Sequence, residues 1–248
     1  MTTHEVADII TSRNLQTAVR LGFDVPVTHA SGFDGAKQGA LVWMKGNRDV
    51  HHTKAAIIIM EMNVLQSLEI LMTPTTYIGV YNPRLEFALT ANELFPEKGF
   101  IGDEVYHHQA RLVNMVTDGF GWVRGHDGKL IKFPHYGKIK VHPTATIAPS
   151  ARIARAALGE TIVEEGVAID NMVHIAHGAH IGAHTSIAAL TCIEGSVKIG
   201  QRCTIGSNVT FQIGSGCGDD VTVGSGSVVT KHIPNGETWV GVPARKIK

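Results

Sequence analysis

The chain has 248 residues, enough for one large or two modest domains with a real hydrophobic core. Its 22 Lys and Arg residues balance 22 Asp and Glu residues, so no net field draws it toward nucleic acid or an anionic membrane. With 44% apolar residues, 18% charged residues and 27 glycines, the composition excludes a disordered chain and favours a fold with many tight turns.

Nothing in the sequence indicates a membrane span or a secretory signal. The longest apolar run, around residue 58, is broken by Glu61 and falls short of the ~18 residues that a span needs. The N-terminus carries His4, Glu5 and Asp8 where a signal would have a basic stretch and an apolar core. The three cysteines lack CxxC spacing, which argues against a disulfide framework or a cysteine zinc site. We therefore expect a soluble cytoplasmic protein.

The first part of the chain is typical of a small α/β domain. Apolar spacing predicts a helix from Thr3 to about Leu21. Short runs rich in Val, Ile and Tyr predict strands at residues 39–44, 55–60 and 76–81. A second helix follows, with Asn82 as its cap, Pro83 at its first position and Pro96 as its stop. We place this domain at residues 1–98 and a junction with a loop at residues 99–136.

Residues 137–248 carry an internal repeat of six. Stepping by six from Ile169 meets an apolar residue each time, at Ile175, Ile181, Ile187, Ile193, Ile199, Ile205, Phe211, Cys217, Val223 and Val229. A helix with 3.6 residues per turn cannot keep this period on one face, and a plain strand alternates at two. Short strands joined by tight corners fit it, because three sides close a triangular coil of ~18 residues that stacks at the ~4.8 Å sheet spacing. The repeat predicts a mainly β domain, a parallel β-helix.

An earlier arm of the repeat runs in a different phase. Val141, Ile147 and Ile153 keep the step of six but do not match the frame that begins at Ile169. The two frames join through residues 156–160, which we interpret as a loop that bulges from one corner.

Several motifs resemble one known family. The runs IDNMVHIAH (residues 169–177) and EGSVKIG (194–200) are similar to the core of the UDP-3-O-acylglucosamine N-acyltransferases of lipid A synthesis. The runs DGFG (118–121), KFP (132–134) and NPRLEFA (82–88) resemble the same family, in the same order. The resemblance implies a hexapeptide-repeat acyltransferase with a left-handed parallel β-helix, a homotrimer, and an N-terminal domain that binds uridine.

The histidine-rich stretch carries the candidate chemistry. An amine that attacks a thioester becomes cationic and must lose a proton, which a histidine can accept near neutral pH. His177 matches the catalytic position of the resembling family. Gly195 lies one coil of 18 residues further on, so its N–H would stack beside His177 and stabilise the oxyanion, the role of the family's equivalent glycine. Asp170 matches the family's orienting carboxylate, although Asp is also a common corner residue.

Other positions are candidates for binding. Asn171, His174 and His180 would line the substrate site. Trp43, at the end of the first strand, would stack on uracil, with burial in the core as an equal alternative. Arg48 or Lys45 would meet a diphosphate. At the other end of the chain, Arg245 and Lys246 would meet the phosphates of CoA, or simply form a solvated tail.

The prediction is an N-acyltransferase that moves an acyl group from acyl-CoA or acyl carrier protein to the amine of a nucleotide-linked amino sugar. It needs no metal and no tightly bound cofactor. Two departures keep alternatives open. The family's second histidine falls at Gly214, which leaves a catalytically silent binding scaffold possible. Residues 240–247 look like the end of sugar acetyltransferases that use acetyl-CoA on N or O acceptors. Parallel β-helices also include a family of zinc carbonic anhydrases, which fits poorly. Two of its histidine ligands are five residues apart, and the residue five after His177 is Gly182.

Overall fold

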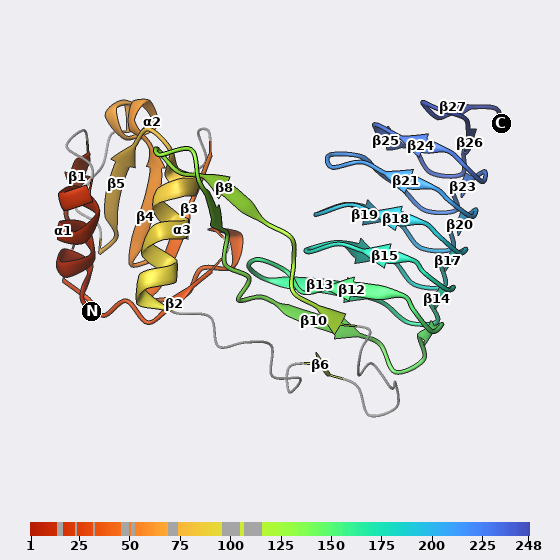
Figure 1. The fold of residues 1–248 in the computed structure, drawn as a ribbon, viewed down its shortest axis with the longest axis horizontal. Helices are drawn as coiled ribbons and strands as arrows, with labels where there is room; N and C mark the ends of the chain where they lie inside the picture. Colours follow the sequence, from red (N-terminus) through yellow and green to blue (C-terminus); the bar gives the residue numbers. More distant parts are fainter. Residues whose placement is uncertain are drawn as a thin grey trace. The chain divides into compact units, whose positions relative to one another are not determined.

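The computed structural model describes residues 1–13, 17–22, 24–31, 33–45, 50, 53–68, 74–95, 105–106 and 116–248. The chain forms two compact units (Figure 1). Residues 1–97 and 121–134 make the first unit, and residues 98–120 and 135–248 make the second. The segment at 99–136, expected as a junction, thus contributes to both. Each unit is described by itself.

The first unit is built on a five-stranded sheet with the order β1-β5-β4-β3-β2. The strands are β1 (Ala18–Arg20), β2 (His29–Ala30), β3 (Ala40–Trp43), β4 (Ile57–Glu61) and β5 (Thr76–Val80). All pairs are parallel except that β1 runs antiparallel to β5. Strand β4 is buried from Ile57 to Met60, as expected of a parallel strand covered on both faces. The three strands predicted from the sequence are confirmed.

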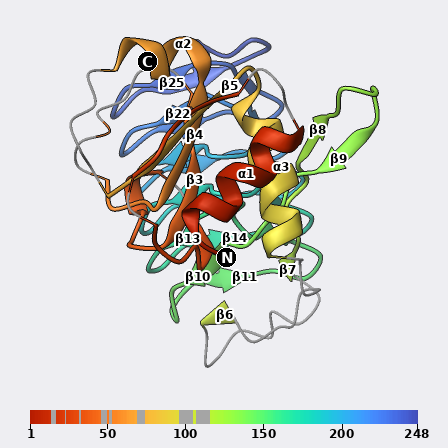
Figure 2. The ribbon, with the colours of Figure 1, turned by 90° about the vertical axis from the view of Figure 1, so that its left-hand side faces the viewer.

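The helices of this unit are α1 (Thr3–Arg13), α2 (Met62–Ser67) and α3 (Pro83–Leu94), with a short 3-10 turn, η1, at Phe33–Gly35. The Asn82 side chain accepts a hydrogen bond from the N–H of Leu85 at 3.1 Å, which confirms the predicted cap. Helices α1 and α3 lie side by side (Figure 2), and Arg13 bonds Thr90 and forms an ion pair with Glu93.

The first helix is shorter than the sequence predicts. It ends at Arg13, and residues 18–20 are strand β1 at the edge of the sheet. The helix predicted over residues 3–21 is therefore wrong at residues 18–20. Pairing with β5 satisfies the backbone hydrogen bonds there better than another turn of helix.

A β-hairpin packs on the first unit, formed by β8 (Trp122–Arg124) and β9 (Leu130–Lys132). Phe133, just after β9, stacks on Phe87 of α3 with ring centroids 5.6 Å apart. The guanidinium of Arg84 lies 5.1 Å from the centre of the same ring. This aromatic cluster explains why residues 121–134 belong to the α/β unit although they follow the first coils of the second unit in sequence.

The second unit is a parallel β-helix with three walls (Figure 1). Wall 1 consists of β6 (Val105–Tyr106), β10 (Lys138–Val141), β13 (Glu160–Val163), β16 (His180–Ile181), β19 (Lys198–Ile199), β22 (Gly216–Cys217) and β25 (His232–Ile233). Wall 2 consists of β11 (Thr146–Ile147), β14 (Ala168–Ile169), β17 (Ser186–Ile187), β20 (Thr204–Ile205), β23 (Thr222–Val223) and β26 (Thr238–Val240), closed by the antiparallel β27 (Arg245–Lys246). Wall 3 consists of β7 (Val116–Thr117), β12 (Arg152–Ala154), β15 (His174–Ile175), β18 (Cys192–Ile193), β21 (Thr210–Phe211) and β24 (Val228–Val229).

The repeat of six fills the centre of the β-helix. Every inward position from Ile169 to Val229 is buried, with at most 3% of its surface exposed, and stacks on its equivalent in the next coil. The predicted fold class is therefore confirmed: mainly β, with a left-handed parallel β-helix after a small α/β part.

The predicted change of phase is also present. Strand β12 pairs Ile153 with Ile175, 22 residues on, whereas β15 pairs Ile175 with Ile193, 18 residues on. The four extra residues lie in the loop between β12 and β13, at the corner where wall 3 meets wall 1. As expected from the sequence, this loop bulges at one corner.

The corners of the coils use left-handed backbone. Residues at equivalent corner positions repeat every 18, and their φ values are positive even where the residue is not glycine, as in Met172, Leu190 and Asn208. A left-handed turn reverses the chain within two or three residues, which the short corners require. Gly178, Ser196 and Gly214 form the same kind of column at the corner of the candidate site.

Candidate active site

The candidate site lies at the corner between wall 3 and wall 1, which we call the histidine corner (residues 176–179, with 194–197 and 212–215 stacked on it). His177 follows β15 and is half-buried. Gly195 follows β18, one coil further on, and is buried. A Cβ atom on Gly195 would lie 2.7 Å from both Cε1 and Nε2 of His177, closer than any side chain can approach. The imidazole therefore lies directly against the backbone of Gly195, and a side chain at this position would displace it.

The N–H of Gly195 makes no hydrogen bond to the described part of the chain. One coil on, the equivalent N–H, of Ile213, donates to Oε2 of Glu194 at 2.9 Å. For Gly195 the residue in the place of Glu194 is Ala176, which has no acceptor. A buried N–H without an acceptor is costly, so this arrangement leaves a donor ready for a bound oxygen beside His177.

The backbone of the histidine corner is held on both sides. The N–H of Ser196 donates to the carbonyl of His177 at 2.9 Å. On the other side, the N–H of Gly178 donates to Oγ1 of Thr161 at 2.8 Å. Thr161 is fully buried and donates its own hydroxyl to the carbonyl of Ala154. The corner is thus fixed in the sheet, which orients His177 before any substrate binds.

A second histidine stands beside His177 that the sequence analysis did not single out. The rings of His135 and His177 meet edge to face, with centroids 5.4 Å apart and an interplanar angle of 71°. His135 is only 1% exposed. The signal that pointed to it is the KFP run at 132–134, which ends one residue earlier. Period and spacing could not have found it, because it lies outside the regular coils.

Asp170 and Asn171 lie at a different corner of the coil, between wall 2 and wall 3, which we call the aspartate corner (residues 170–173). Oδ1 of Asp170 accepts hydrogen bonds from the backbone N–H of Asn171 at 2.7 Å and from its Nδ2 at 2.9 Å. Strand β15 separates this corner from His177. Within one chain, the carboxylate of Asp170 therefore bonds Asn171 and not His177.

The two histidines that flank the corner point from different walls. His174 is on wall 3, and desolvation lowers its pKa. His180 is on wall 1, where its Nε2 lies 2.6 Å from Oε1 of Glu164. The hydrogen bond from His180, together with one from the N–H of Ala183, holds the pKa of Glu164 below its usual value of 4.5. His184, the fourth histidine, packs on Gly166 one coil earlier, at the next corner.

The candidate nucleotide residues belong to the first unit. Trp43 ends β3, is half-buried, and meets Phe133 edge to face with centroids 6.3 Å apart. Arg48 lies outside the described residues. At the far end of the chain, Lys246 forms an ion pair with Glu237 at 2.7 Å, and the exposed Arg245 donates to the carbonyl of Ala244.

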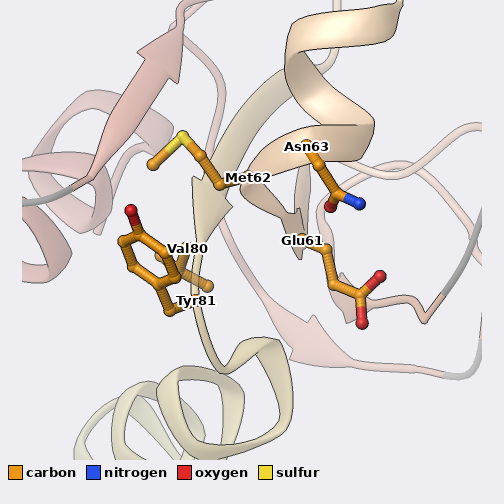
Figure 3. A pocket seen from close by; sticks show the side chains of 5 residues that line it. All are labelled: Glu61, Met62, Asn63, Val80 and Tyr81. Carbon is orange, nitrogen blue, oxygen red and sulfur yellow. The ribbon is translucent and has the colours of Figure 1, made fainter.

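A pocket opens in the first unit beyond the carboxyl ends of β4 and β5, the edge of a parallel sheet where ligands usually bind. It measures about 310 Å³ and is lined by Glu61, Met62, Asn63, Val80 and Tyr81. Figure 3 shows Met62 and Tyr81 on one side of the pocket, with Glu61 and Asn63 on the other. It offers an aromatic face opposite a carboxylate and an amide.

A shallow groove of about 520 Å³ follows the outer face of wall 2. Small side chains line most of it, among them Ala148, Ala168 and Ala188, and Asp170 also lines it. No helix in the described part of the chain is long and apolar enough to cross a membrane.

Together the six-residue repeat, the three walls and the histidine corner define a hexapeptide-repeat β-helix protein. No family model matches the chain. The UDP-3-O-acylglucosamine N-acyltransferase of Bordetella pertussis is 36% identical over 148 residues, which cover 57% of this chain and 39% of the relative. That of a Caulobacter species is 34% identical over 154 residues, 60% of this chain and 43% of the relative. The resemblance seen in the motifs is confirmed, and the chain spans less than half the length of these relatives.

Solved structures are less similar. LpxA from Acinetobacter baumannii is 20% identical with a TM-score of 0.43, over 54% of this chain and 51% of that one. PerB from Caulobacter crescentus, solved with CoA and GDP-perosamine, is 24% identical with a TM-score of 0.36, over 44% and 57%. The acetyltransferase domain of PglB from Neisseria gonorrhoeae, solved with acetyl coenzyme A, is 18% identical with a TM-score of 0.36, over 90% and 100%.

Proposed function

We propose that the protein is an N-acyltransferase that moves an acyl group from a thioester to the amine of a nucleotide-linked amino sugar. One observation carries the proposal: the imidazole of His177 lies against Gly195, whose N–H has no acceptor in the described chain. Acyl transfer needs a base and a hydrogen-bond donor for the oxyanion, and here the two lie one coil apart.

In the proposed reaction, the sugar amine attacks the thioester carbonyl and forms the new C–N bond. The N–H of Gly195 stabilises the oxyanion, a contribution of ~10²–10³ in rate. His177 takes the proton that the nitrogen must lose, worth ~10²–10⁴. The C–S bond then breaks, and the leaving thiolate takes up that proton. No covalent enzyme intermediate is needed.

We propose that Asp170 orients His177 across the interface of a homotrimer. The two residues lie at different corners of the same coil, so one chain cannot pair them. Packing the aspartate corner of one subunit against the histidine corner of the next would bring them together. Asn171 and His174 would line the resulting cleft, and His180 would face it from wall 1. The resemblance of the runs IDNMVHIAH and EGSVKIG to the acyltransferase family implies a homotrimer, in which such a pairing can form.

For the acceptor, we propose that the first unit binds the nucleotide. Trp43 would present its exposed part to the base, and the pocket at Tyr81 and Glu61 offers a second surface. Arg48 would meet the diphosphate. Since CoA thioesters and nucleotide sugars are cytoplasmic metabolites, the proposed reaction implies a cytoplasmic enzyme.

For the donor, we propose acyl-CoA or acyl carrier protein, not held as a tight cofactor. The groove on wall 2 would accept the extended thioester arm, because its alanines leave room beside Asp170. Arg245 is exposed and would meet a phosphate, whereas Lys246 is already engaged by Glu237.

A second candidate is a sugar acetyltransferase that uses acetyl-CoA on an N or O acceptor. It is favoured by the run at 240–247, which contains the closing strand β27 and resembles the end of such enzymes. The same corner would carry out the chemistry, and only the donor and acceptor would differ.

The test measures free thiol released from acetyl-CoA, longer acyl-CoA and acyl carrier protein, with UDP-linked amino and hydroxy sugars as acceptors. We expect turnover with an amino sugar and a loss of ~10²–10⁴ in kcat for His177→Ala. His184→Ala is the matched control, since His184 also packs on a glycine but at another corner. Full turnover by His177→Ala would refute the role of His177 as the base. No turnover with any pair of donor and acceptor would favour a binding scaffold.

A further inference from the structure

His135 is a buried ring that touches the candidate base without belonging to the repeat. Its centroid lies 5.4 Å from that of His177, and the two rings are inclined at 71°. With 1% of its surface exposed, His135 is out of reach of substrate. It can act on the reaction through the ring of His177, which it contacts.

His135 also packs against a glycine. A Cβ atom on Gly119 would lie 2.1 Å from Cδ2 and 2.2 Å from Nε2 of His135. The His135 ring thus lies against the backbone of Gly119, as the His177 ring lies against that of Gly195. The contacts link Gly119 to His135, His135 to His177, and His177 to Gly195.

The segment that carries Gly119 is itself anchored. Oδ1 of Asp118 lies 3.0 Å from Nε of Arg155, whose side chain is only 11% exposed. The N–H of Arg155 donates to the carbonyl of Thr117 at 3.0 Å. Arg155 opens the loop with the four extra residues, between β12 and β13. This loop therefore fixes the Asp118–Gly119 segment against the β-helix.

We propose that His135 is a positioning residue: held against Gly119, its ring keeps the imidazole of His177 against Gly195. Without His135, the imidazole has space to rotate about χ1 and χ2, away from the place where the amine must release its proton. Misplacement of a catalytic group by about 1 Å can cost ~10²-fold in rate. The kinetic part of this inference rests on the proposed function, whereas the contact between the rings does not.

The test therefore has two readouts. The first is the nuclear Overhauser effect between the Cε1 proton of His177 and the α protons of Gly195, measured with selectively labelled histidine and no substrate. The second is kcat and KM in the thiol-release assay. The variants are His135→Ala, His135→Asn and Gly119→Ala, and His184→Ala is the control. Melting temperatures identify any variant that fails to fold.

We expect a strong Overhauser effect between His177 and Gly195 in the wild type and in His184→Ala. The other three variants should lose it. Their kcat should fall by ~10–100-fold with KM within about twofold, because the binding groups are untouched. The inference would be overturned if folded His135→Ala kept the Overhauser effect between His177 and Gly195. It would also be overturned if His135→Asn, which lacks the ring, restored both this effect and kcat. If the wild type turns over no substrate, the proposed function fails and the first readout still decides whether His135 positions His177.

Discussion

In the candidate site, the imidazole of His177 lies against the backbone of Gly195. The two residues are 18 apart in sequence and one coil apart in the β-helix. There is no room for a methyl group between them, since it would lie 2.7 Å from Cε1 and Nε2. The proposed base and the proposed backbone donor are therefore held as one fixed pair, and the coil geometry sets the distance between them.

Gly195→Ala should disable the enzyme without unfolding it. The new methyl group meets the end of a side chain, so the imidazole can turn away and the coil can remain intact. We expect kcat to fall by ~10²-fold because the base is displaced, with a melting temperature close to that of the wild type. Thiol release and circular dichroism measure the two effects. A fully active Gly195→Ala would contradict the tight contact.

Gly200→Ala should lower the stability of the β-helix and leave the activity of the folded protein unchanged. Here a Cβ atom would lie 2.3 Å from the backbone C and O of Gly218, which cannot move without breaking the stack of coils. We expect a loss of stability of ~1–3 kcal/mol in urea unfolding. The folded fraction should keep its activity, because Gly200 lies at the corner between wall 1 and wall 2. Unchanged stability would show that the coils can separate there.

Mixed trimers test the role of Asp170. His177→Ala and Asp170→Asn should each have little activity alone. If a site takes its histidine from one subunit and its aspartate from the next, random assembly of equal amounts leaves about a quarter of the sites intact. Co-expression with two different tags, followed by the thiol assay, measures this. Mixtures no better than the separate variants would place both residues in one chain or remove Asp170 from the site.

Phe211→Ala tests the core of the β-helix. Phe211 is fully buried and stacks between Ile193 and Val229 on wall 3. Loss of the ring should cost about 3–5 kcal/mol of unfolding free energy, because a rigid coil cannot close the cavity. Urea denaturation measures it, with the exposed Leu190→Ala as a control expected within about 0.5 kcal/mol. A small effect for Phe211→Ala would mean that the coils can collapse.

The pair of Glu164 and His180 predicts a dependence of stability on pH. Its hydrogen bond to His180 lowers the pKa of Glu164 from 4.5 in the folded state. A carboxyl group whose pKa is lower in the folded than in the unfolded state stabilises the fold when the pH is above its unfolded pKa. This stabilisation is lost as the pH falls through the folded pKa. The melting temperature of the wild type should therefore exceed that of Glu164→Gln above about pH 4.5, and the gap should close in acid.

The difference should be small, since the Glu164 side chain is 41% exposed and screened by water. Glu165→Gln is the matched control, because its side chain makes none of the hydrogen bonds found in the described chain. A gap that grows in acid would have the wrong sign for a carboxylate whose pKa is lowered on folding.

The amino-acid sequence alone determined the β-helix. A period of six is a local property, so Ile169 and its successors could be read as inward residues and the 18-residue coil followed from arithmetic. The coil in turn predicted that His177 and Gly195 stack. The α/β unit was predicted less completely, because the pairing of residues 18–20 with β5 is a long-range contact that overrides local helix preference.

Only the tertiary structure decided the rest. Sequence spacing linked Asp170 to His177, but a triangular coil turns between them and places them at separate corners. His135 and Gly119 lie outside the repeat, and only the folded chain brings them to the histidine corner. Whether the N–H of Gly195 finds an acceptor within the described residues likewise depends on which side chain lies one coil below. The reason is physical: a short period fixes what stacks along the axis, whereas contacts around the axis depend on how irregular segments close against it.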